Sequence, residues 1–137
     1  MMQRNLQIVA RMSALAVGFL MLGAVVSAHH SAAQYAKEAT TTRGVVVEYR
    51  WRNPHVYVVW EVKGPGETRH WIGELSSVTT MIADGMTKDS LKVGDEIEVV
   101  ACPSMNPGST EAWVRTIKRA DGTVVVDTTR GACTVRP

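Results

Sequence analysis

The chain of 137 residues is poor in aromatic side chains, which make up 6 %, and has one phenylalanine and two cysteines. It contains no CxxC pair, no glycine-rich phosphate loop, no nucleophile elbow and no paired-carboxylate signature. Metal–thiolate sites, nucleotide binding and hydrolase chemistry each depend on one of these patterns. The sequence also lacks internal repeats and low-complexity tracts. We therefore expect a protein that is not an enzyme.

Residues 1–28 have the pattern of a secretory signal peptide. Arg4 and Arg11 form a basic start, residues 12–26 are uncharged and apolar, and Val26-Ser27-Ala28 is a small-residue cleavage site. The apolar stretch is short for a membrane span, which needs roughly 20 residues. An uncleaved N-terminal anchor is the alternative. We expect cleavage and a periplasmic protein with no membrane span in its mature part.

Cleavage changes the charge of the protein. The chain has 15 basic and 13 acidic residues, and the two arginines of residues 1–28 leave with that segment, so the mature part is neutral with histidine uncharged. No basic run or stripe remains that would indicate nucleic acid or an anionic membrane surface. We expect the partner to be a periplasmic protein or a small ligand.

Both cysteines, Cys102 and Cys133, lie in the mature part. An even number of cysteines in an exported protein favours a disulfide. A bond between them would hold the C-terminal tail to the folded domain. The alternative is a pair of free thiols.

Alternating apolar and polar residues predict five strands and a short sixth. We expect the strands at residues 43–51, 56–62, 68–75, 96–101, 112–119 and 123–127, with one helix at 76–85. A helix between the third and fourth of five strands is the element order of an OB-fold. We predict an all-β, OB-fold-like, partly open barrel over residues 43–127, between an extended lead-in at 29–42 and a tail at 128–137. A small β-sandwich is the alternative.

Several segments resemble a family of small exported bacterial proteins classed as a domain of unknown function. The matching segments are His29-His30-Ser31, Gly44-Val45-Val46, Trp51-Arg52-Asn53-Pro54-His55-Val56, Trp71 with Glu74-Leu75, and the block from Gly85 to Asp95. Met86 departs from the aromatic residue that members often have, and the two cysteines are not a family feature. The resemblance implies a secreted β-barrel and carries no catalytic residue with it.

The four histidines give the most concrete functional hypothesis. Cleavage after Ala28 makes His29 the first residue, so its amine and ring could chelate one metal ion. His30 adds a second imidazole, and His55 or His70 could complete the site. Nitrogen-rich ligation of this kind suits copper(II) first, then nickel(II) or zinc(II). The alternatives are a solvated His29-His30 pair, a His55 ring hydrogen-bonded to the backbone of its turn, and an exposed His70.

A second hypothesis is a metal-free module that binds a protein, a peptide or a saccharide on its barrel face. OB barrels commonly bind ligands across their second and third strands and the adjoining loops. The predicted binding face consists of Trp51, Asn53, Tyr57, Trp71 and Glu74. The four tryptophans could instead be core, above all Trp60. His70 and Glu74, on one face of a predicted strand, form a weak acid–base candidate.

Overall fold

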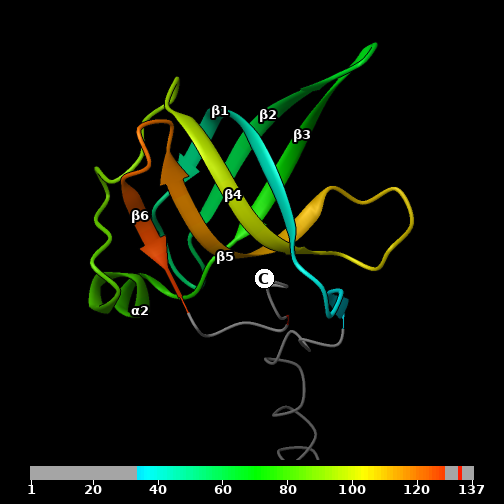
Figure 1. Cartoon of the computed structure of the whole chain (residues 1–137). Coiled ribbons are helices and arrows are strands. Elements are labelled where there is room, and N and C mark those ends of the chain that lie inside the picture. Colours follow the sequence, from blue (N-terminus) through cyan, green and yellow to red (C-terminus); the bar gives the residue numbers. More distant parts are fainter. Residues whose placement is uncertain (1–33, 129–132, 134–137) are drawn as a thin grey trace, which may run out of the picture. The chain divides into compact units, whose positions relative to one another are not determined.

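The computed structural model describes residues 34–128 and Cys133. This part contains β1 (Thr40–Arg50), β2 (Tyr57–Gly64), β3 (Glu67–Glu74), α2 (Val78–Ala83), β4 (Glu96–Pro103), β5 (Glu111–Arg119) and β6 (Val124–Asp127) (Figure 1). The expected signal peptide and its cleavage site lie outside the described residues. No helix among the described residues is long and apolar enough to cross a membrane.

The strands form one sheet in the order β3-β2-β1-β4-β5-β6. A parallel pairing of Ile72–Glu74 on β3 with Glu111–Trp113 on β5 closes the first five strands into a barrel. Closure removes most of the unpaired edges that an open sheet would expose. Strand β6 adds to β5 outside this ring. The prediction of an OB-like barrel with one short helix is confirmed.

The folded part begins earlier than the sequence pattern indicates. Strand β1 starts at Thr40 and not at Arg43, because residues 40–45 pair with β4. Upstream, Tyr35 forms an isolated bridge with Ser104 and is 6 % exposed. The described end of the predicted lead-in is therefore packed on the barrel. Its partners are distant in sequence, so a local pattern could not reveal them.

A β-bulge interrupts the regular alternation predicted for the first strand. The register between β1 and β2 shifts between Val46 and Glu48. Val46 is fully buried, whereas Tyr49 and Trp51, which strict alternation would place on the opposite face, also pack against the core. A bulge inserts one residue and so exchanges the faces that follow it.

Strand β2 supplies the centre of the core. Val58 and Trp60 are fully buried, as their alternation predicts, and the Trp60 indole N–H donates to the Thr42 hydroxyl at 3.1 Å. Trp60 stacks on Trp71 of β3, with ring centroids 6.1 Å apart. Gly73 lies beside them, where a Cβ atom would stand 2.5 Å from Val114. The absence of a side chain at this position lets the tryptophan pair fit.

Helix α2 is short because its sequence supports only one buried turn. Ser77 caps its N-terminus by accepting from the Thr80 N–H, and Asn53 accepts from the Val78 N–H at 3.2 Å. The spacing of Val78, Met81 and Ile82 predicts an apolar stripe on this helix. Met81 is buried, but Ile82 is 60 % exposed, so this prediction is wrong at Ile82.

The predicted disulfide between Cys102 and Cys133 is present, with the two Cα atoms 5.7 Å apart. Together with Tyr35, the two cysteines form a small buried cluster separate from the barrel core. Arg115 fastens the same region because it donates to the carbonyls of Thr128 and Cys133. The bond therefore holds Cys133 against the outside of the barrel.

Candidate functional site

The most unusual polar residue of the barrel is Glu74. It is the last residue of β3, faces outward, and is only 7 % exposed. Its backbone lies between Tyr57 on β2 and Trp113 on β5, where β3 and β5 close the barrel. A carboxylate is costly to bury unless it has partners, so its surroundings indicate what the site can do.

Two side chains from outside the sheet contact the two oxygens of this carboxylate. His55 Nδ1 makes an ion-pair contact with Glu74 Oε1. The Tyr35 hydroxyl donates to Glu74 Oε2 at 3.0 Å. Trp113 lies against both partners, with its ring centroid 6.0 Å from that of Tyr35 and 6.3 Å from that of His55. We call these four residues, together with Tyr57, the Glu74 cluster.

The two tyrosine hydroxyl groups of the Glu74 cluster have raised pKa values. Burial raises the pKa of Tyr35, and the nearby charge of Glu74 raises it further. Burial and the same carboxylate also raise the pKa of Tyr57, with a further contribution from Glu111. Both hydroxyls therefore stay protonated at neutral pH.

The structure brings together only part of the predicted binding face. Tyr57 and Glu74 are direct cross-strand neighbours on the outer face. Trp71 lies on the opposite face, stacked on Trp60. Trp51 packs against the core and Tyr49, and Asn53 holds the start of α2.

The structure pairs His70 and Glu74 with other residues and not, as the sequence suggested, with each other. His70 does not pair with Glu74, because four residues along one strand separate them by about 13 Å. Its Nε2 atom lies 3.5 Å from Oε2 of Glu61, its cross-strand neighbour on β2, and its side chain is 58 % exposed. Glu74 pairs instead with His55 from the loop before β2. Sequence reasoning missed this pair and the contribution of Tyr35, since loop and lead-in contacts carry no periodic signal.

Two of the four predicted metal ligands, His29 and His30, lie outside the described residues. Among residues 34–128 and Cys133, no three His, Cys, Asp or Glu side chains are grouped closely enough to hold a metal ion. His55 and His70 therefore do not complete a site by themselves in that part of the chain.

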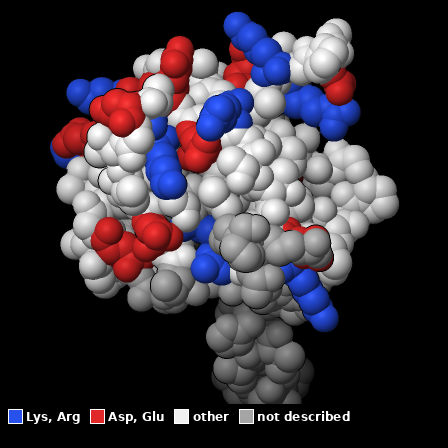
Figure 2. All heavy atoms as spheres, viewed as in Figure 1, with Lys and Arg blue, Asp and Glu red and all other residues white. Residues whose placement is uncertain are grey.

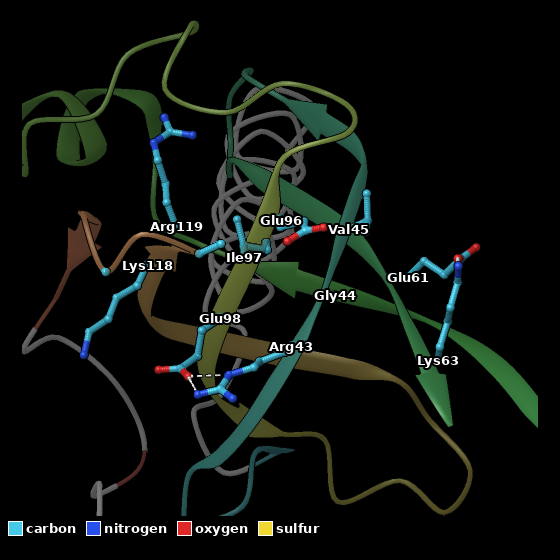
Figure 3. Close-up of a pocket in the computed structure, with 12 residues that line it drawn as sticks. Arg43, Gly44, Val45, Glu61, Lys63, Glu96, Ile97, Glu98, Lys118 and Arg119 are labelled. Atoms are coloured by element: carbon cyan, nitrogen blue, oxygen red, sulfur yellow. Dashed lines mark hydrogen bonds and ion pairs between the residues drawn. The ribbon is translucent and has the colours of Figure 1, made fainter. Parts of the chain in front are cut away.

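A separate cleft of about 850 Å³ crosses the outer surface where β1 passes from β4 to β2 (Figure 3). Gly44 lies in its wall, and a Cβ atom there would stand 2.1 Å from the Glu61 carbonyl oxygen, so only glycine permits this crossing. The charged residues that line the cleft are Arg43, Glu61, Lys63, Glu96, Glu98, Lys118 and Arg119.

Two pairs of charges in this cleft contact each other, Arg43 with Glu98 and Lys63 with Glu61. Arg43 donates to Glu98 at 2.8 Å, as the dashed lines of Figure 3 show. Charges of both signs also alternate over the face of the molecule shown in Figure 2, without a continuous basic stripe. Such exposed pairs contribute little stability. The cleft is a polar surface of mixed charge.

Comparison with known proteins gives a family and similar solved structures. The family described as "Family of unknown function (DUF6152)" matches residues 18–113. No curated protein matches the chain. Among solved structures, the mitochondrial single-stranded DNA binding protein Rim1 of S. cerevisiae is similar with a TM-score of 0.46 and 11 % identity, over 67 % of this chain and 97 % of that one. A similarity this weak carries no argument about ligands.

Proposed function

The chain belongs to the family of unknown function DUF6152, and membership in this family supplies no activity. We propose from the geometry that the chain is an exported periplasmic protein that binds a transition metal ion, copper first. The proposed ligands are His29 and His30 near the mature N-terminus, completed by His55. The observation that carries the proposal is the contact between His55 Nδ1 and the buried carboxylate of Glu74.

A histidine that binds a metal commonly gives its other ring nitrogen to a carboxylate, which fixes the ring and raises its basicity. His55 has this arrangement through Nδ1, so Nε2 is the nitrogen that would bind the ion. The His55 side chain is 25 % exposed, which gives a ligand access to the ring. Trp113 packs edge-on against the ring and limits its movement.

The chain connects the predicted N-terminal histidines to the same place. Tyr35 is held to Glu74, and His30 precedes Tyr35 by five residues. Five extended residues span at most roughly 18 Å, and the proposal requires this short segment to bring His30 to His55. His70 lies at the other end of the outer face and is left out of the proposed site.

The proposed chemistry sets the choice of metal and the pH dependence. An amine and several imidazoles are nitrogen donors, which suit copper(II) before nickel(II) or zinc(II). Imidazole and amine bind only when unprotonated, so affinity should weaken as pH falls toward 6.

The test is copper(II) titration of the mature protein, followed by native mass spectrometry. We expect one copper ion per chain for the wild type and for His70→Ala, which is the matched control because His70 also faces a carboxylate. The double variant His29→Ala/His30→Ala and the single variant His55→Ala should lose stoichiometric binding. The melting temperature of the metal-free double variant should be nearly unchanged. Equal copper binding by that double variant would exclude the proposed site.

A second function is favoured by the mixed-charge cleft. Its volume is typical of small-ligand sites, and its charges of both signs suit a zwitterionic ligand such as a short peptide. Titration with tripeptides in the presence of a chelator, followed by NMR, distinguishes peptide binding in the cleft from metal binding by the histidines. Shifts at Lys118 and Glu96 that persist without metal would favour the cleft, whereas their absence would favour the histidine site.

A further inference from the structure

We infer that two copies of this chain associate through the outer edges of their β3 strands. The two edges pair antiparallel, with Thr68 of one copy opposite Thr68 of the other. This proposal is independent of metal binding. The edge belongs to the β2–β3 arm, residues 57–74, whose hairpin end extends beyond the barrel (Figure 1). Strand β5 pairs with β3 only at Ile72–Glu74, so among the described residues no strand pairs with this edge between Glu67 and Trp71.

The backbone groups of the open edge are known from the alternation of a strand. The Ile72 N–H points away from β2 and donates to the Thr110 carbonyl near β5. Residues two and four positions earlier, His70 and Thr68, present their N–H and C=O groups to the same side. These groups form a short template for another strand.

The side chains of this edge are complementary to a second copy. With Thr68 opposite Thr68 of the other copy, Glu67 faces Arg69 and Arg69 faces Glu67. The two residues already pair within one strand, at 2.7 Å, so they lie on one face. Both side chains are more than half exposed. Opposite charges directly across a strand pair stabilise it, and like charges destabilise it.

The paired segment is short. Pro65 and Gly66 form the turn that joins β2 to β3, so this register ends at Glu67 and pairs Glu67, Thr68 and Arg69 with the same three residues of the other copy. The other registers that join edge-facing residues oppose two arginines when centred on Arg69, or extend into Ile72, which is already paired. Charge and pairing thus select one two-fold arrangement, and a two-fold contact is self-limiting.

The contact is small, so we expect weak association with a dissociation constant on the order of 0.1–1 mM. The test is sedimentation equilibrium of the mature protein over that concentration range. Glu67→Arg and Arg69→Glu should each weaken dimerisation about tenfold or more, because each opposes like charges twice. Mixed in equal amounts, the two variants should form a heterodimer, since one edge is then all positive and the other all negative.

Two controls make the result specific. The double variant Glu67→Arg/Arg69→Glu restores both opposite-charge pairs and should dimerise as the wild type does. Lys63→Glu makes the same change of charge on the β2 side of the arm, away from the edge, and should leave dimerisation unchanged. Heterodimer formation also demonstrates that both single variants are folded. A wild type that stays monomeric throughout, or single variants that dimerise as it does, would overturn the inference.

Discussion

Where the β2–β3 arm forms part of the barrel, its inner face is apolar and its outer face is polar. The inner face carries Trp60, Trp71 and Gly73, which fill the core by close packing. The outer face, one residue along each strand, carries Tyr57 and Glu74 in a buried polar cluster. The same backbone therefore serves two tasks. The inner face determines whether the barrel closes, and the outer face determines what lies against it.

This difference has a physical origin. The inner face is covered by the barrel itself, so each side chain is fixed by volume. The outer face is covered by segments from outside the sheet, the loop of His55 and the segment of Tyr35, and is fixed by hydrogen bonds. Substitutions that change side-chain volume on the inner face should therefore reduce only the free energy of unfolding. Substitutions in the Glu74 cluster should also change tyrosine pKa values and metal binding.

The largest expected effect is on the inner face. Gly73→Ala places a Cβ atom 2.5 Å from Val114 and 2.8 Å from Trp60, both in the packed core. We expect a loss of about 2–3 kcal/mol in the free energy of unfolding, measured by urea denaturation. Gly64→Ala is the matched control, because its Cβ atom meets nothing closer than 3.6 Å. Equal stability of the two variants would show that the inner face is loosely packed.

A smaller loss and a distinct titration change are expected on the outer face. Glu74→Gln removes a charge but little volume, and should cost about 1–2 kcal/mol through weakened hydrogen bonds. It should also lower the pKa of Tyr35 and Tyr57, both of which Glu74 raises. Burial alone raises the pKa of Tyr49, so Tyr49 is the internal control. Tyrosine ring NMR signals followed from pH 9 upward report all three groups.

The sign of the associated stability change follows from the raised pKa values. A tyrosine whose pKa is higher in the folded state than its unfolded value of about 10 stabilises the protein below that pH. This contribution is lost as pH rises above 10. The wild type should therefore lose more stability than Glu74→Gln over the alkaline range. Unchanged titration of Tyr35 and Tyr57 in the variant would contradict the description of the cluster.

The smallest effect separates a structural residue from a binding residue. Asn53 accepts from the Val78 N–H at the start of α2. Asn53→Ala should therefore cost about 0.5–1 kcal/mol, as the loss of a helix cap does. Copper stoichiometry by native mass spectrometry should stay unchanged. Loss of copper binding by a folded Asn53→Ala protein would show that Asn53 belongs to the binding site.

The sequence was sufficient for features that depend on neighbours along the chain. Alternation predicts the buried Val58 and Trp60, and Ser76 or Ser77 with Gly85 predicts a short helix between the third and fourth strands. The cysteine pair was predicted from the even count and the expected export. Each of these signals is local or compositional.

The remaining features depend on contacts between distant segments. The bulge near Val46 and the early start of β1 follow from pairing with β2 and β4. The link between His55 and Glu74 joins a loop to a strand end, and Tyr35 reaches both from the lead-in. No periodicity in the sequence indicates such contacts, so the pairing of Glu74 with His55 could not be predicted from it.

The most direct test of the central claim observes the His55 ring itself. Zinc(II), a diamagnetic substitute for copper(II), is added to ¹⁵N-labelled mature protein, and the histidine ring nitrogens are followed by long-range ¹H–¹⁵N spectra. The account predicts that the Nε2 signal of His55 shifts with one equivalent of metal while both ring nitrogens of His70 stay in place. Stoichiometric metal binding with unchanged His55 ring signals would contradict it.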